Sequence, residues 1–285
     1  MRQLNEIADA KDSAAILVEL TSAFEGIAST RIAQVKDQVQ RSGRFFDDLW
    51  RIYSQLRVGE SFNFGRAQAG TNAKPKELMI LITSEGSFSG DIDQKLITQA
   101  LIDYNPSKKD IIVVGYHGIA QLRQHQVQAT LNFKLPTSDQ NINVAPLVAA
   151  VQKYASTVVY YQSYVSLMQQ DVKTIALGAA ISRRGASVAL GEEVISEQTY
   201  IFEPSTRAVI GHLERTMIGI ALSEVILESK LAQYASRFRA NRAAHEKADE
   251  SLGNLSWLYA RGRRQLKDER LKEIINGLRN GGRRS

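Results

Sequence analysis

The sequence predicts a long helix at each end of the chain, the two pairing as an antiparallel coiled coil, with an α/β domain inserted between them. All five prolines, at positions 75, 106, 136, 146 and 204, lie in the middle of the chain, and proline interrupts long helices. The flanks are rich in helix-forming residues, whereas the middle alternates short apolar runs with helical patterns. We expect an N-terminal coiled-coil helix over 1–57, a linker over 58–76, the inserted domain over 77–203 and a C-terminal coiled-coil helix with a basic tip over 204–285.

The first flank carries apolar residues at helical spacing. Steps of three and four residues join, in order, Leu17, Leu20, Phe24, Ile27, then Ile32 and Val35. Such steps place side chains on one face of a helix, so these residues are expected in the seam with the second helix. The pattern leaves open a second interpretation, two amphipathic helices packed on a globular core.

The middle of the chain has the periodicity of an α/β fold. Strands are expected over 78–83, 111–116, 127–133 and 157–164, and helices over 91–104 and 144–154. Strands that alternate with helices of this length are typical of a Rossmann-like sheet. The turn over 84–90 follows a strand, where such sheets often bind ligands, but it lacks G-x-G-x-x-G and is interpreted as a plain turn.

Basic charge is concentrated at the C-terminal end. Residues 237–285 hold 13 Lys+Arg against 6 Asp+Glu, a net charge of +7. If the flanks run antiparallel from the same domain, the first helix ends near the level of Tyr259, and the rest of the second continues alone. That tip carries Arg261, Arg263, Arg264, Lys267 and Arg270. A lone basic helix is not stable by its own packing, so we expect an acidic partner; a frayed basic tail is the alternative.

Residue patterns for catalysis are missing from the sequence. There is no cysteine, the four histidines are scattered without a metal-ligand spacing, and no G-x-S-x-G turn occurs. Residues 65–72 have the glycine spacing of a phosphate loop, but Thr71 stands where its lysine would be. We therefore expect no catalytic, cofactor or metal site. The tip's aromatics precede its basic run, which argues against nucleic acid. No apolar run is long enough to span a membrane, and the N-terminus lacks a signal pattern.

Four segments resemble the gamma subunit, or rotor shaft, of F-type ATP synthases. Residues 82–90 (ITSEGSFSG) resemble the family's I-T-S-D-R-G-L-C-G-G-L-N turn, and 200–205 (YIFEPS) its Y-x-Y-E-P-S box. Residues 227–238 are similar to L-E-S … E-H-A-S-R-M, and 19–28 can be laid on K-I-T-K-A-M-E-M-V-A. Phe24 replaces a family methionine, and only Arg263 survives from the terminal N-x-x-R-Q motif. The chain is similar to a divergent member.

The resemblance implies a non-catalytic subunit without cofactors that transmits torque and couples proton or sodium transport to ATP synthesis or hydrolysis. The implied partners are an alpha/beta-type hexamer, an epsilon-type subunit and a membrane c-type ring, at the cytoplasmic face of the cell membrane. The hexamer would contact Phe24 and the basic tip, and the ring would contact Tyr200, Glu203 and Pro204. Glu203 could equally serve only the start of the last helix, expected at Ser205.

Three other functions remain open from the sequence. The chain could be the shaft of a paralogous ATPase that does other mechanical work. It could be a small-molecule-binding α/β domain whose helices serve as dimerisation arms. It could also be a nucleic-acid-binding coiled coil that uses its basic tail.

Overall fold

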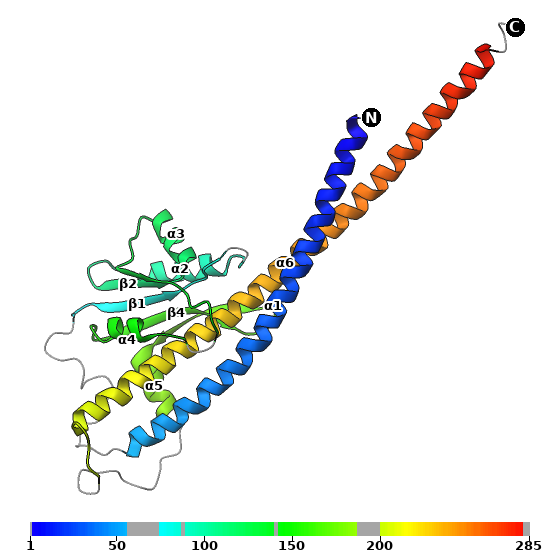
Figure 1. Ribbon diagram of the computed structural model, residues 1–285. Helices are drawn as coiled ribbons and strands as arrows, with labels where there is room; N and C mark the ends of the chain where they lie inside the picture. The colour runs from blue at the N-terminus through cyan, green and yellow to red at the C-terminus, as the bar shows by residue number, and fades with distance from the viewer. Residues whose placement is uncertain (1, 56–73, 87–88, 140–141, 187–199, 282–285) are drawn as a thin grey trace. The chain divides into compact units, whose positions relative to one another are not determined.

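The computed structural model describes residues 2–55, 74–86, 89–139, 142–186 and 200–281. Two long helices, α1 (Arg2–Gln55) and α6 (Thr206–Gly281), enclose the other elements in the chain order. Between them come β1 (Glu77–Ile82), α2 (Ile92–Ile102), β2 (Lys109–Val114), α3 (Tyr116–Gln124), β3 (Leu131–Phe133), α4 (Ala145–Val151), β4 (Thr157–Tyr164), β5 (Gln170–Ala176) and α5 (Leu177–Ala186). The predicted fold class, two long terminal helices around an α/β domain, is confirmed (Figure 1). Residues 58–73 of the expected linker lie outside the described residues.

The chain divides into two compact units. Unit 1 comprises Met1–Ile27 and Phe238–Ser285, and unit 2 comprises Ala28–Arg237. Each long helix therefore contributes one stretch to each unit. Among the described helices, none combines the length and the apolarity that crossing a bilayer requires.

Unit 2 is built on a five-stranded sheet with the order β3-β2-β1-β4-β5. The first four strands in that order run parallel, and β5 pairs antiparallel with β4. At the centre, Ile80 of β1 lies between Ile112 of β2 and Val159 of β4. These three side chains are fully buried, as expected for parallel strands covered on both faces.

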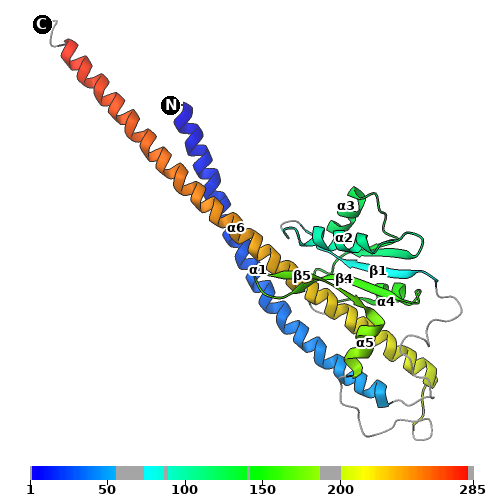
Figure 2. The ribbon, with the colours of Figure 1, turned by 180° about the vertical axis from the view of Figure 1, so that it is seen from behind.

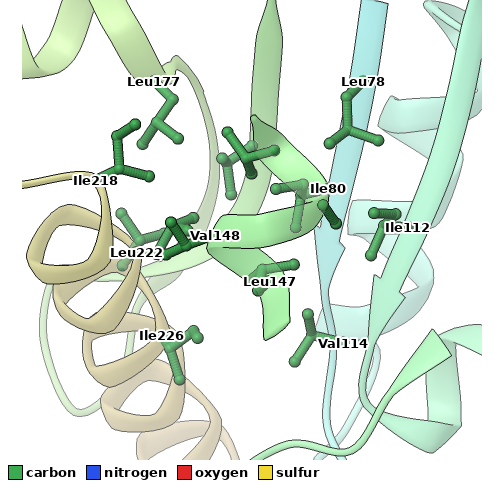
Figure 3. Packing of buried hydrophobic residues seen from close by; sticks show 14 of the residues in the cluster. Leu78, Ile80, Ile112, Val114, Leu147, Val148, Leu177, Ile218, Leu222 and Ile226 are labelled. Atoms are coloured by element: carbon green, nitrogen blue, oxygen red, sulfur yellow. The ribbon is translucent and has the colours of Figure 1, made fainter. Parts of the chain in front are cut away.

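Different helices cover the two faces of the sheet. On one face, Met79 and Leu81 of β1 pack against α2 and α3, in a cluster that includes Leu96 and Leu122. On the other face, a larger cluster joins the sheet to α4, α5 and the first part of α6; Figure 3 shows its centre. Its labelled members are Leu78, Ile80, Ile112, Val114, Leu147, Val148, Leu177, Ile218, Leu222 and Ile226. The first third of α6 is therefore part of the α/β core.

The long helices also pack together within unit 2. Val35 of α1 and Leu227 and Leu231 of α6 form a buried cluster, with Ile32 and Tyr234 packed against it. The seam predicted for this stretch is confirmed. Towards the end of α1, the buried Tyr53 hydroxyl donates a hydrogen bond of 3.1 Å to Glu214 of α6, and burial raises the pKa of that tyrosine.

Three predictions about the middle elements were incomplete or wrong. Of the strand expected over 127–133, only Leu131–Phe133 forms. Helix α3 was not predicted, because the apolar run over 111–116 was extended through Gly115. Gly115 has φ +106°, and a Cβ there would lie 2.1 Å from the Thr83 carbonyl oxygen, so the chain must turn at this glycine. Strand β5 and helix α5 were not predicted either; β5 is an edge strand in which polar residues outnumber apolar ones.

Candidate interaction surfaces

Unit 1 consists of two antiparallel helical segments in side-by-side contact (Figure 2). His245 Nδ1 of α6 lies 3.2 Å from the Val18 carbonyl and 3.3 Å from the Thr21 hydroxyl of α1. Further along, the Lys11 ammonium lies 5.5 Å from the centre of the Tyr259 ring. Leu4 packs against Gly262 so closely that a Cβ at 262 would lie 2.7 Å from its Cδ1 atom. The residue numbers therefore fall along α1 as they rise along α6, so the two segments run antiparallel.

The seam prediction was wrong for α1 in unit 1. Leu17, Leu20, Phe24 and Ile27 have exposed fractions of 54, 47, 44 and 57%. The helix turns a different face to α6, which includes Leu4, Ala14, Val18 and Thr21. Small residues such as Ala14 and Gly262 let two helices approach closely, whereas the larger side chains form a second row on the outside. We call the exposed row the outer stripe; it comprises Ile16, Leu17, Leu20, Phe24 and Ile27.

The basic tip of α6 extends past the start of α1. Leu4, in the first turn of α1, packs on Gly262, and Leu266 is the last partly buried residue among those of α6 whose side chains are described. Every residue from 267 to 277 is exposed, and α6 continues to Gly281, roughly 22 Å beyond Leu266. The single-helix stretch was expected from about residue 260, but the contact of Leu4 with Gly262 makes it begin later, at about residue 267.

The five predicted basic contact residues are all exposed. The Arg261 guanidinium lies 5.5 Å from the centre of the Trp257 ring, on the same helix. Within the part of the chain that the structure describes, no carboxylate forms an ion pair with Arg263, Arg264, Lys267 or Arg270. Exposed apolar side chains accompany these charges, with Leu271, Ile274 and Ile275 exposed at 56, 59 and 54%. The surface can therefore offer both cationic and apolar contacts.

The second predicted contact set, at the start of α6, belongs to unit 2. Tyr200, Glu203 and Pro204 are exposed, and the neighbouring Ile201 is 92% exposed. Helix α6 begins at Thr206, one residue later than expected. Its cap is the hydroxyl of Ser205, which accepts a hydrogen bond of 3.2 Å from the Ala208 amide. The capping role considered for Glu203 is thus filled by Ser205.

The usual ligand crevice of this sheet is filled by α6. The strand order reverses between β1 and β4, and open α/β sheets bind ligands beyond the carboxyl ends of such strands. At that point, Gln162 of β4 contacts Ser229 and Gln233 of α6, and all three side chains are buried. The Ser236 hydroxyl donates a hydrogen bond of 2.6 Å to the carbonyl of Ser89 in the turn after β1. The turn after β1, where such sheets bind ligands, therefore contacts α6.

Sequence reasoning missed these buried polar contacts. Ser229 and Ser236 stand in the quoted L-E-S and A-S-R segments, and together with Gln233 they recur at helical spacing inside an apolar stretch. That spacing of polar residues was the available signal. Among the described residues, no group of three or more His, Asp or Glu side chains could hold a metal ion. The segment over 65–72 lies outside the described residues.

Comparison with known proteins identifies the family. The family model described as ATP synthase matches residues 3–279. The ATP synthase gamma chain of Geobacter sp. (strain M21) is 22% identical over 91% of this chain and 92% of its own length. That of Chloroherpeton thalassium is 24% identical over 97% of both chains.

Solved structures share the fold. A chain of the Euglena gracilis mitochondrial ATP synthase, in an assembly with the c-ring in rotational state 3, matches with a TM-score of 0.62 at 14% identity, over 96% of this chain and 94% of that chain. A chain of the Tetrahymena thermophila mitochondrial ATP synthase, from the central stalk and c-ring, matches with a TM-score of 0.55 at 16% identity, over 79% of this chain and 99% of that chain. With a family match that runs almost from end to end and relatives that share its full length, the chain belongs to the ATP synthase gamma family.

Proposed function

We propose that the chain is the central-stalk rotor subunit of an F-type ATP synthase. It carries torque between an alpha/beta-type nucleotide-binding hexamer and a membrane c-type ring, and so couples proton or sodium transport to ATP synthesis or hydrolysis. The subunit performs no catalysis itself; the chemistry occurs on its partners. The family membership supports this function, and so does the name ATP synthase gamma chain that its relatives carry.

Unit 1 carries the proposal. It has two exposed surfaces that a soluble two-helix rod does not need, the outer stripe on α1 and the basic tip of α6. Contiguous exposed apolar side chains mark interaction sites, and a single helix needs a surrounding partner to stay formed. A socket with an apolar wall and an acidic rim would satisfy both surfaces. We assign this socket to the hexamer, with Phe24, Arg263 and Arg264 among the contacts.

Unit 2 is assigned to the membrane end of the complex. The exposed Tyr200, Ile201, Glu203 and Pro204 form a mixed apolar and acidic surface at the start of α6. We propose that this surface contacts the c-type ring at the cytoplasmic face of the membrane and that an epsilon-type subunit binds next to it. The structural relatives come from assemblies that include the c-ring, which supports the ring contact.

The alternatives are not favoured. A small-molecule-binding α/β domain would need an open crevice at the carboxyl ends of β1 and β4, and α6 occupies it through Ser229 and Gln233. The two helical segments of unit 1 pair with each other within one chain, so they do not need to serve as dimerisation arms. A specialised paralogous ATPase is not favoured either, because the relatives are named as ATP synthase subunits.

Reconstitution tests the function. The purified chain is combined with an alpha/beta-type hexamer, and ATP hydrolysis and shaft rotation are measured. We expect the isolated chain to hydrolyse no ATP and the wild-type complex to rotate. Failure of the wild-type chain to bind any such hexamer would overturn the proposal.

A charge-reversed variant tests the tip within the same assay. Arg263→Glu with Arg264→Glu should weaken assembly or coupling while the α/β domain stays folded. The matched control reverses two exposed cations of unit 2, Lys108→Glu with Arg123→Glu, and should rotate normally. If the tip variant couples like the control, the basic tip does not engage the hexamer.

A further inference from the structure

A buried polar network joins α6 to the interior of the α/β domain. Gln162 lies at its centre and donates a hydrogen bond of 2.6 Å to Asp93 at the start of α2. The side-chain oxygen of Gln162, Oε1, accepts hydrogen bonds from the Ser229 hydroxyl and, at 3.3 Å, from Nε2 of Gln233. Gln233 Nε2 also donates to Ser229 Oγ at 3.1 Å. These four side chains are at most 2% exposed. We call them the Gln162 network.

From Asp93, hydrogen bonds continue to Ser84 after β1 and to His117 in α3. The Asp93 carboxylate accepts hydrogen bonds from the backbone amide and the hydroxyl of Ser84, directly after β1. It also lies 2.8 Å from His117 Nδ1, in the first turn of α3. One buried carboxylate thus ties β1, α2 and α3 to the glutamine that holds α6.

Neighbouring residues of α6 make further directed contacts with the same domain. Lys230 donates hydrogen bonds of 2.7 Å and 3.2 Å to the carbonyls of Pro136 and Ser138. Arg237 Nε lies 3.3 Å from the Ser89 hydroxyl, next to the hydrogen bond that Ser236 makes with the Ser89 carbonyl. Over little more than two helical turns, α6 therefore holds one strand and two loops through polar groups.

Such contacts differ from the apolar ones that precede them on the helix. Ile218, Leu222 and Ile226 pack on the sheet through nondirectional contacts, which a helix can keep when it rotates or slides a little. A hydrogen bond depends on direction, and a buried polar group that loses its partner is strongly unfavourable. A displacement of one turn would break every contact of Ser229, Gln233 and Ser236 together. The polar stretch therefore allows only one placement of α6.

We infer that the Gln162 network locks the register of α6 on the α/β domain, so that Gln162, Ser229 and Gln233 are positioning residues for torque transfer. The inference rests on the proposed function. Torque that enters the α/β domain from a ring leaves through the long helices, and slippage of α6 on the domain would reduce the torque that is passed on. Open α/β sheets often bind ligands in the crevice at this position, and in this protein α6 occupies it.

The test measures coupling in the complete complex. Gln162→Leu removes the hydrogen bonds that Gln162 makes with Asp93, Ser229 and Gln233, and Ser229→Ala removes those of the Ser229 hydroxyl. Leu222→Ala removes an apolar contact of α6 outside the network and is the matched control. Each complex is placed in vesicles, and the ATP hydrolysis rate, the ions transported per ATP and the Tm are recorded. We expect the network variants to keep hydrolysing ATP but to transport at least twofold fewer ions per ATP. The control should keep its coupling ratio even where its Tm falls as far.

Each outcome decides a separate point. Normal coupling by both network variants overturns the inference and leaves the proposed function standing, whereas uncoupled wild-type complexes count against the function itself. Equal loss of coupling in Leu222→Ala at equal Tm would reduce the network to ordinary stability and also overturn the inference. If Gln162→Leu does not assemble, Gln233→Leu removes the two hydrogen bonds of the Gln233 side-chain amide and keeps those that Gln162 makes with Asp93 and Ser229. It should give a smaller loss of coupling in the same direction; no loss overturns the inference.

Discussion

Lys230 is a buried charged residue at which a single substitution should be costly to stability. Its side chain is 3% exposed and forms an ion pair with Asp139, whose side chain is 7% exposed. It also donates to the carbonyls of Pro136 and Ser138. Lys230→Met keeps the flexible stem but removes the charge and every donor. Asp139 then retains Arg31 at 3.6 Å, a side chain that is 48% exposed.

The expected cost follows from this geometry. Removing one partner of a buried ion pair typically destabilises a protein by about 3–5 kcal/mol, since an uncompensated charge stays buried. Because Arg31 still faces Asp139, we expect the lower end, about 3 kcal/mol. Urea unfolding followed by tryptophan fluorescence in a Trp257→Phe background measures this loss of stability. The remaining tryptophan, Trp50, reports on unit 2, because its ring centre lies 5.3 Å from that of Tyr53 within this unit.

A second variant supplies the control. Lys230→Met combined with Asp139→Asn removes both charges, so the double variant should be less unstable than the two single variants added together. Strict additivity would mean that the two side chains do not interact. A loss below about 1 kcal/mol for Lys230→Met alone would refute the reasoning that this pair is buried and coupled.

Three further outcomes are expected. Phe24→Ser should change the unfolding free energy by less than about 0.5 kcal/mol, as for an exposed site, yet reduce self-association of the isolated chain in sedimentation measurements. Ser205→Ala should lower stability by about 1 kcal/mol in thermal unfolding, whereas Glu203→Ala should leave it nearly unchanged; the reverse order would contradict the assigned cap. The hydrogen bond from Lys76 lowers the pKa of Asp110, so this carboxylate stabilises the fold above the ordinary aspartate pKa, and its contribution disappears as pH falls through the lowered value. Asp110→Asn should therefore destabilise the protein at neutral pH but not in strong acid; a loss that does not depend on pH would exclude the charge.

The sequence predicted those elements whose pattern has one interpretation. β1 and β2 contain apolar runs that are buried on both faces, and β4 is rich in β-branched and aromatic residues, so their sequence indicates strands without further context. Edge strand β5 contains Gln, Asp, Lys and Thr, so its composition does not indicate a strand. Its pairing with β4 determines its structure. Strand β3 pairs with β2 over three residues, too short for a periodic signal.

The interaction surfaces show the same limit. Periodicity predicted correctly that α1 has an apolar row, but two neighbouring rows satisfy the same spacing, and the one with Leu4, Ala14 and Val18 faces α6. Leu20 and Phe24 were therefore assigned to the wrong face, although a partner contact at Phe24 remains a prediction. The buried contacts of Ser229 and Gln233 were invisible to an apolar pattern, because a polar residue inside a helix shows no partner until the fold brings Gln162 to it.

The small number of buried side chains in unit 1 has a consequence for local unfolding of the isolated protein. Among the described residues of unit 1, Ala14 is the single buried hydrophobic residue, at 6% exposure, while unit 2 contains whole clusters of buried hydrophobic residues. Regions with few buried contacts open at low free energy, so backbone amides of residues 2–27 and 238–281 should exchange with solvent deuterium much faster than those of β1 or β2. Bound inside a partner, the same amides should become protected. The amides of α6 that are protected only in the complex would show which part of the helix is kept folded by a partner and not by contacts within its own chain.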